Sequence, residues 1–290
     1  IVKTSDSDAA EIIKRVPGIS LIENRFIIVR GLSQRYNNVS INNGAVPSSE
    51  ADGRAFSFDI IPSSNIDNMM IIKSPTAELP GDFSGGFIKI STKNMPDENS
   101  LSLSVGTGIN TVTHFKDFSL LQSSSTEWLG FDRCARPLSK DFPSHLGSIT
   151  DPSQITYYTK TGFNNDWNVK TFRPLPDLKL NLTWNRKIGD KVGTVLTFGY
   201  SNANKTIPDM QNTRYGIYSA TADVPTIEKN YIDNQFTNEV KINAMNNWSF
   251  ILDSRNRFEF RNLFSQIGKN RFTERYGTST VSGEYYENQT

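Results

Sequence analysis

The second part of the chain is dominated by segments in which apolar and polar residues alternate with a period of two. In 101–110 the apolar side chains fall on one face and small or polar side chains on the other. The same alternation recurs in 178–184, 192–200, 240–244 and 258–264. This pattern is typical of β-strands with one apolar face. The sequence therefore predicts five amphipathic strands after residue 100.

The connections between these strands alternate in length. The long links are 111–177 and 203–235, whereas the links at 188–191 and 253–256 are tight turns. Outer-membrane β-barrels combine short periplasmic turns with long extracellular loops. The alternation therefore favours a transmembrane β-barrel in which 111–177 and 203–235 are extracellular loops.

Aromatic residues stand close to the ends of the predicted strands, where barrels carry girdles at the lipid boundary. They are Trp184, Tyr200, Trp248 and Tyr276. We expect the apolar faces to contact outer-membrane lipid. Because the smallest membrane barrels have about eight strands, five strands indicate the N-terminal part of a larger barrel, of roughly 22 strands with a plugged lumen.

The region before residue 97 has shorter and more varied elements, which predict a mixed α/β domain. Apolar spacing predicts a helix over 9–16, with Asp8 as its N-cap and Pro17 after its end. Strands are predicted at 26–29, 39–41, 69–73 and 87–92, and Asn42-Asn43-Gly44 carries a hairpin signal after the second of them.

Composition narrows the function classes. Lys and Arg number 31 and Asp and Glu 30, so the net charge of +1 gives no sign of a nucleic-acid partner. One cysteine excludes an internal disulfide. The longest apolar runs have four residues, far below the roughly 18 of a membrane helix. No signal peptide opens the sequence, so we expect an export signal upstream of residue 1.

Five short blocks of the first region stand in a characteristic order. They are 29–31, 43–47, 60–68, 71–74 and 85–93. In this order they resemble the plug domain of TonB-dependent outer-membrane receptors, and the predicted barrel strands follow as in that family. The resemblance divides the chain into a plug domain at 1–96, without its first strand and TonB-contacting segment, and barrel strands at 97–290.

The resemblance implies a function as well as a fold. It implies an active transporter, not an enzyme, in the outer membrane of a Gram-negative bacterium. A ligand (siderophore, glycan or peptide) binds from outside, and the TonB complex of the inner membrane moves the plug. The implied partners also include outer-membrane lipid and a surface lipoprotein, and no cofactor or metal is implied.

Polar side chains of the plug region form two groups of candidate site residues. The first group would form a ligand-binding surface at the plug apex: Arg35, Tyr36, Asn37, Asn38, Ser48, Ser49 and Arg54. The second would form ion pairs between plug and barrel wall: Arg30 and Glu78, with Arg54 a further candidate. The alternative interpretations are plain turn chemistry for the first group and solvated surface charges for the second.

Two other patterns favour structural roles. The stretch 82–86 nearly spells a serine-protease motif, but the inserted Phe83 displaces Ser84 and both histidines follow it, so we expect a tight turn before a buried strand. His114, Cys134 and His145 fit no zinc spacing, and we expect them to be solvated loop residues.

Two other function classes remain open at this point. A structural or secretion-associated outer-membrane barrel would share the fold and need no TonB-contacting segment. A glycan-binding β-sandwich would have a second apolar layer and no rule of short and long connections.

Overall fold

The computed structural model describes residues 9–23, 25–46, 48–49, 54–61, 63–121, 124–132, 137–163, 168–280 and 283–289. They form two compact units. The first unit comprises Ile1–Val105, Leu180–Tyr200 and Ile242–Ser265, and the second comprises Gly106–Lys179, Ser201–Lys241 and Gln266–Thr290. All but the last of the long strands therefore contribute to both units, and the division at residues 96 and 97 stays a prediction.

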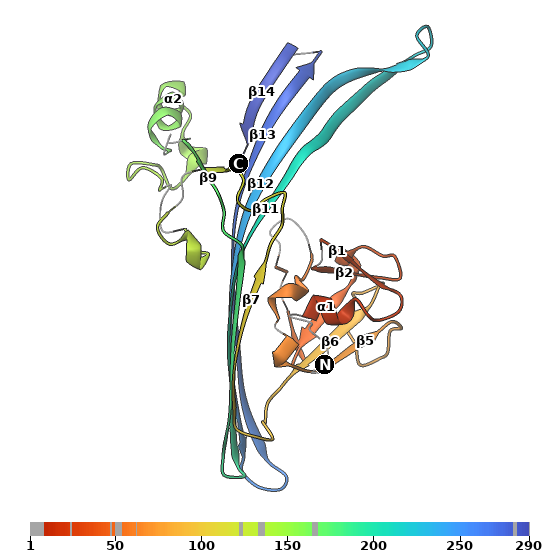
Figure 1. Cartoon of the computed structure of the whole chain (residues 1–290), viewed down its shortest axis with the longest axis vertical. Coiled ribbons are helices and arrows are strands. Elements are labelled where there is room, and N and C mark those ends of the chain that lie inside the picture. The colour runs from red at the N-terminus through yellow and green to blue at the C-terminus, as the bar shows by residue number, and fades with distance from the viewer. Residues whose placement is uncertain are drawn as a thin grey trace. The chain divides into compact units, whose positions relative to one another are not determined.

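A four-stranded sheet forms the centre of the N-terminal region (Figure 1). Its order is β4 (Gly44–Ala45), β3 (Asn38–Ile41), β6 (Phe87–Thr92) and β5 (Ile66–Ile72). β6 runs parallel to β3 and antiparallel to β5. Ile88 and Ile90 of β6 are fully buried, because β6 is an inner strand. The strands predicted from short apolar runs are thus confirmed.

The helix and the first strands pack beside this sheet. α1 (Ala9–Ile13) is shorter than the predicted 9–16, because Arg15 and Val16 donate to Ile12 and Ile13 in tighter three-residue turns. The predicted N-cap, Asp8, lies outside the described residues. β1 (Ile19–Ile22) pairs antiparallel with β2 (Phe26–Val29), and only β2 was predicted. Short helical turns complete the region: η1 (Gln34–Tyr36), η2 (Phe58–Ile60) and η3 (Ser63–Asn65).

The predicted hairpin connects β3 to β4. Its two turn residues are Asn42 and Asn43, with φ angles of 53° and 67°, while Gly44 already pairs with Ile41. Two consecutive positive φ angles are typical of the type I′ turn, which Asn tolerates. The hairpin is confirmed, one residue earlier than an Asn-Gly turn would place it.

A six-stranded sheet contains the long strands, each beside the next along the chain (Figure 1). They are β7 (Ser100–Gly108), β10 (Asp177–Ile188), β11 (Val192–Ser219), β12 (Val224–Ile251), β13 (Arg257–Ser279) and β14 (Gly283–Gln289). The link predicted as a loop at 203–235 is strand for most of its length, because β11 and β12 continue through it, and its extracellular location stays a prediction. The count of five strands is wrong, since β14 adds a sixth within the described residues.

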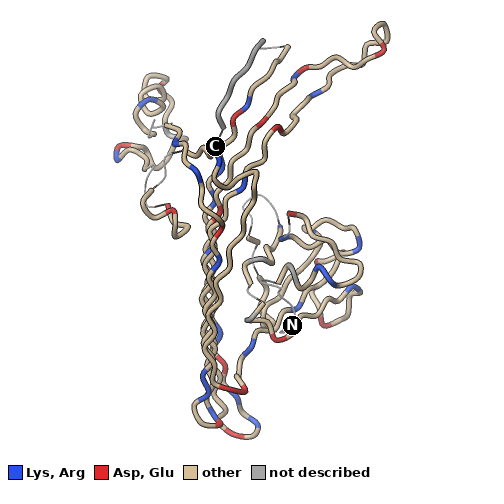
Figure 2. Tube along the Cα trace, viewed as in Figure 1, with Lys and Arg blue, Asp and Glu red and all other residues tan. Residues whose placement is uncertain are grey.

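The predicted apolar faces are mostly exposed in the isolated chain, as lipid-facing residues would be. Leu101 and Leu103 of β7 are 71% and 68% exposed. Val240 and Ile242 depart from this expectation, because both are buried. Near the short turn after β12, the rings of Trp248, Phe250 and Phe258 lie in a row with centroids about 6 Å apart. Figure 2 shows charged residues gathered at these short turns.

The long link between β7 and β10 contains small elements of its own. They are β8 (Phe118–Leu121), η4 (Glu127–Leu129), η5 (Leu146–Ser148), α2 (Pro152–Thr161) and β9 (Val169–Phe172), with β8 and β9 paired. Phe118 packs edge-on against Phe236, which stacks on Phe272.

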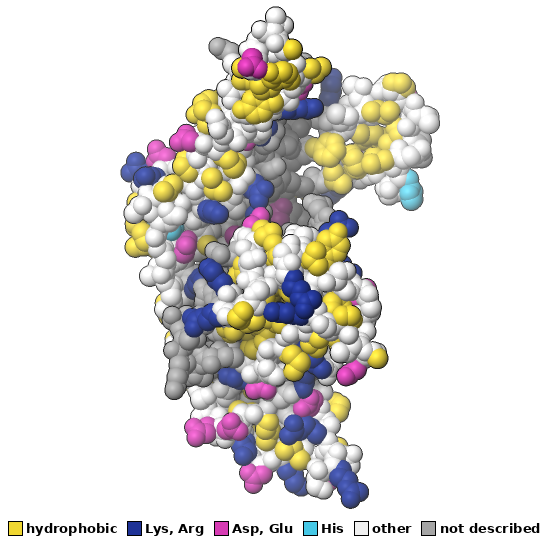
Figure 3. Space-filling view, turned by 90° about the vertical axis from the view of Figure 1, so that its right-hand side faces the viewer, with side chains coloured by type: hydrophobic (Ala, Val, Ile, Leu, Met, Phe, Trp, Pro, Cys, Tyr) yellow, Lys and Arg dark blue, Asp and Glu magenta, His cyan; other side chains and the backbone are white. Residues whose placement is uncertain are grey.

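Exposed apolar side chains gather at the β11–β12 hairpin tip, at the top of Figure 3.

Among the described residues, no helix is long and apolar enough to cross a membrane.

Candidate functional site

Three side chains from separate parts of the plug region meet in one polar cluster. Arg54 donates from Nη2 to Asp82 Oδ2 at 2.6 Å, and it also bonds Asn38, whose amide nitrogen donates to Asp82 Oδ1. Arg54 and Asp82 are about half exposed, at 49% and 54%. The Arg54 hydrogen bond holds the pKa of the Asp82 carboxyl below its ordinary value. We call these three residues the Arg54 cluster.

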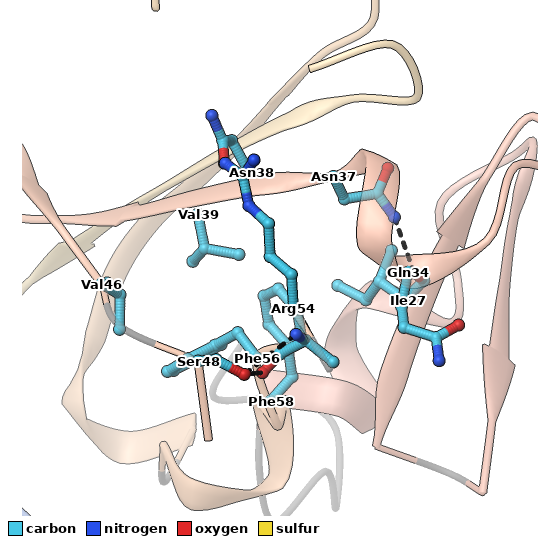
Figure 4. A pocket seen from close by; sticks show the side chains of 11 residues that line it. Ile27, Gln34, Asn37, Asn38, Val39, Val46, Ser48, Arg54, Phe56 and Phe58 are labelled. Atoms are coloured by element: carbon cyan, nitrogen blue, oxygen red, sulfur yellow. Dashed lines mark hydrogen bonds between the residues drawn. The ribbon is translucent and has the colours of Figure 1, made fainter. Parts of the chain in front are cut away.

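A small hollow that encloses about 30 Å³ and opens to solvent lies beside the Arg54 cluster. Its apolar lining comes from Ile27, Val39, Val46, Ala55, Phe56 and Phe58, and its polar lining from Gln34, Asn37, Asn38, Ser48 and Arg54. In Figure 4 the Arg54 side chain extends past Val39 toward Asn38. Four of the seven predicted apex residues thus share one hollow.

Two serines fix the segment that carries Arg54. Ser48 Oγ donates to the Ala55 carbonyl at 3.0 Å and accepts from the Ala55 amide at 3.1 Å. Ser49 Oγ accepts from the Ser57 amide at 2.9 Å. Because these hydroxyls bind the backbone on either side of Phe56, Ser48 and Ser49 position the segment, as turn chemistry predicts.

The remaining apex residues differ in exposure. The Arg35 guanidinium lies 5.1 Å from the ring centre of Tyr36, and both side chains are exposed. Asn37 is buried, and its amide donates to the Ile27 carbonyl at 2.7 Å (Figure 4). A Cβ at Gly85 would lie 2.2 Å from Asn37 Oδ1, so a glycine is needed there. Asn37 therefore supports the hollow from below its surface.

Asparagine side chains join the plug region to the long strands within the first unit. Asn65 donates to Thr197 Oγ1 of β11 at 2.7 Å. Asn247 of β12 donates to Thr92 Oγ1 and to the Lys93 carbonyl, both at 3.0 Å. Asn94 donates to Glu259 of β13 at 3.3 Å. These contacts had no signal in the sequence, because an amide hydrogen bond requires only two residues that the fold brings together.

The predicted ion pairs to the wall are not among the contacts of the described residues. Arg30 and Glu78 are exposed, and neither forms an ion pair within the described part of the chain. Arg54 pairs with Asp82 inside the plug region instead. The role of Arg30 and Glu78 at the wall stays a prediction.

The other singled-out residues have structural surroundings. Ser84 lies in the turn before β6, where its amide donates to the Tyr36 carbonyl at 3.1 Å, as expected for a tight turn. His114 is buried, not solvated: its Nδ1 accepts from the Asn110 amide at 2.7 Å, and its Nε2 lies 3.1 Å from Asp177. His145 is exposed, and Cys134 lies outside the described residues. No group of metal-ligating side chains occurs among the described residues.

A comparison with protein families gives the decisive observation on identity. Residues 1–87 match the model of the TonB-dependent receptor plug domain. The chain carries a TonB-dependent receptor plug. Antiparallel barrel strands follow this plug, and such receptors lie in the outer membrane of Gram-negative bacteria, which is the location of this chain. The predicted plug domain, fold class and location are thereby confirmed.

The solved structures to which this chain is similar include a ferric enterobactin receptor, a siderophore receptor and a copper transporter. A mutant of the ferric enterobactin receptor PfeA from Pseudomonas aeruginosa, in complex with enterobactin, is 10% identical over 99% of this chain and 39% of its own, with a TM-score of 0.38. The siderophore receptor PirA from Acinetobacter baumannii is 11% identical over 97% and 55%, with a TM-score of 0.31. The copper transporter OprC is 13% identical over 98% and 47%, also at 0.31.

The chain thus spans between 39% and 55% of the length of these three structures. Because the three TM-scores are below 0.5, these similarities say nothing about the plug of this chain or its ligand. A search among curated protein sequences found no match.

Proposed function

We propose that this chain is the plug and first wall strands of an active transporter that binds a ligand at the cell surface and imports it when the TonB complex moves the plug. The observation that supports this proposal most directly is that the Arg54 cluster and the wall contacts lie at opposite ends of the plug sheet. The wall contacts are the hydrogen bonds that join Asn65, Thr92, Lys93 and Asn94 to the long strands. Asn38 pairs with Phe87 at one end, while Ile66 pairs with Thr92 at the other. A six-residue strand separates the two ends by about 20 Å.

The wall contacts lie near the short turns. Asn247 is four residues from the end of β12, and Thr197 is five residues from the start of β11. Because short turns face the periplasm in outer-membrane barrels, the Thr92 end of the plug sheet is periplasmic. The Arg54 cluster then faces the exterior, where a ligand arrives.

The chemistry of the wall contacts supports a plug that can move. The neutral hydrogen bonds of Asn65 and Asn247 each contribute about 0.5–1.5 kcal/mol net, and the bond of Asn94 to the Glu259 carboxylate contributes about 1.5–3 kcal/mol. Water can replace these partners once the plug shifts. Breaking a buried ion pair would cost about 3–5 kcal/mol, since it leaves an uncompensated charge. The observed contacts hold the plug in place without such a barrier.

A reversible lock between plug and wall tests this proposal in the full-length receptor. Asn65→Cys and Thr197→Cys, in a Cys134→Ser background, would be joined by a short, reducible bis-thiol reagent. The assay is growth under a condition in which deletion of the receptor stops growth. We expect the crosslink to stop growth and reduction to restore it.

The two single-cysteine variants, treated with the same reagent, are the matched controls and should grow normally. Growth that is equal with the crosslink formed and cleaved would show that import needs no plug movement, and the proposal would fail.

A further inference from the structure

We infer that the hollow beside the Arg54 cluster binds an apolar group that carries a carboxylate, and that the Arg54 guanidinium receives this carboxylate. The inference rests on the proposed function for the direction from which the ligand arrives, and it adds the ligand's chemical class. The group would be one anchoring part of the imported molecule.

The described lining of the hollow contains one charged side chain. It is Arg54, whose guanidinium is paired with Asp82 outside the lining. Gln34 and Asn38 add amide groups that can donate hydrogen bonds. A guanidinium with neighbouring amide donors matches the geometry of a carboxylate.

Asp82 shows which chemical group Arg54 accepts. Its carboxylate lies 2.6 Å from Arg54 Nη2, the short distance of a charge-assisted hydrogen bond. Both partners are about half exposed, and solvent screens such surface pairs, so the pair contributes little to stability. A ligand carboxylate can therefore replace Asp82 at little cost, because water solvates the displaced Asp82.

The floor of the hollow specifies an apolar body for the ligand group. Phe56 and Phe58 meet edge to face, with ring centres 5.1 Å apart, and Val39 and Val46 add branched side chains. The hollow encloses only about 30 Å³, room for about two waters, and it is open to solvent on one side. It therefore suits the edge of a single aromatic ring or of a branched aliphatic group, the rest of which lies outside it.

Three probes with the same ring and different charge test the inference. Benzoate, benzamide and benzylamine would be titrated into the purified full-length receptor in detergent, with binding followed by ligand-observed NMR. We expect benzoate to bind at least ten-fold more tightly than the other two. Arg54→Gln should abolish this preference, and Asp82→Asn should raise benzoate affinity several-fold, because Arg54 loses its internal partner.

Lys14→Gln is the matched control, since it removes an exposed positive charge that does not line the hollow and should leave benzoate binding unchanged. Arg54→Lys guards against a folding defect, because it keeps the charge and should retain part of the preference for benzoate.

Equal binding of the three probes, or unchanged benzoate binding in Arg54→Gln, would overturn the inference. So would tightest binding of benzylamine that depends on Asp82. These outcomes are separate from the crosslink test, which does not depend on ligand charge. If the crosslink stops growth but the receptor does not bind benzoate, the proposed function stands and this inference fails.

Discussion

Asn247 of β12 and Thr92 at the end of β6 are joined by a buried hydrogen bond of 3.0 Å. Thr92 Oγ1 also accepts from the Asn42 amide at 2.8 Å, and the Thr92 amide donates back to Asn42 at 2.9 Å. Three polar side chains thus connect the β3–β4 turn, the end of β6 and the wall. The last residues of the plug sheet are therefore held to the barrel by groups without charge.

Replacing Asn247 should loosen this end of the plug. Asn247→Ala leaves Thr92 and the Lys93 carbonyl without their wall partner, which costs about 1–3 kcal/mol for buried polar groups. We expect faster hydrogen exchange of the amides in 87–94 of the full-length receptor. Asn246→Ala, the same exchange one position earlier, should leave these amides protected, and equal effects of both variants would contradict the role of Asn247.

Gly81 and Gly85, which precede β6, differ in the space available for a side chain. A Cβ at Gly85 would lie 2.2 Å from Asn37 Oδ1, and Asn37 cannot retreat without losing its bond to Ile27, whereas Gly81 has nothing within 4 Å of its virtual Cβ. We expect Gly85→Ala to destabilise the plug by about 1–3 kcal/mol and Gly81→Ala to change it by less than about 0.5 kcal/mol. Local opening free energies from hydrogen exchange measure both, and a neutral Gly85→Ala would refute the packing argument.

The sequence predicted the amphipathic part of the strands because lipid and lumen impose opposite polarity on successive residues. It missed the extensions of β11 and β12, which lack such a boundary. There Asn238 donates to Asn202 and Asn204 at 2.8 and 2.9 Å, so polar residues occupy strand positions without any apolar alternation. Strands of 28 residues are also far longer than the roughly 9–11 that a membrane requires.

The long link after β7 should detach from the sheet if a close backbone contact is blocked. A Cβ at Gly268 would lie 2.5 Å from Gly130 Cα, and Gln266 donates to the Gly130 carbonyl at 2.8 Å. We expect Gly268→Ala to break this hydrogen bond and to increase protease cleavage within 124–132. Gly147→Ala, which meets nothing within 4 Å, is the control. Cleavage rates that match the wild type in both variants would exclude the contact.

The candidate site was predicted only in part, for a physical reason. Asn38 and Arg54 were predicted from their own segments, but Asp82 enters the cluster because β3 and β6 pair in parallel. Asp82 is 44 residues from Asn38, and no spacing rule connects them. Ser48 and Ser49 were selected as ligand residues, yet their hydroxyls bind the backbone at Ala55 and Ser57, the alternative that turn chemistry offered.

The ion pair between Asp82 and Arg54 should persist to a pH below the ordinary carboxyl pKa. The Arg54 hydrogen bond lowers the pKa of Asp82 in the folded state. The stabilisation is therefore present above the ordinary carboxyl pKa and is lost as pH falls through the lowered value, so the pair should stay intact between about pH 5 and 8. Carboxyl carbon NMR should show an upward shift of the Asp82 midpoint in Arg54→Gln. Asp253, whose pKa is lowered by Asn256, should keep its midpoint.

The sidedness of two cysteines tests the account most directly. Ser84→Cys would mark the Arg54 end of the plug, and Ser254→Cys would mark the short turn between β12 and β13, both in the Cys134→Ser background. A membrane-impermeant maleimide, small enough to enter the barrel from outside, would be applied to intact cells and to cells with a permeabilised outer membrane. We predict labelling of Ser84→Cys in intact cells and labelling of Ser254→Cys only after permeabilisation. Labelling of Ser254→Cys in intact cells, with Ser84→Cys reacting only after permeabilisation, would show that the Arg54 end faces the periplasm and would contradict the account.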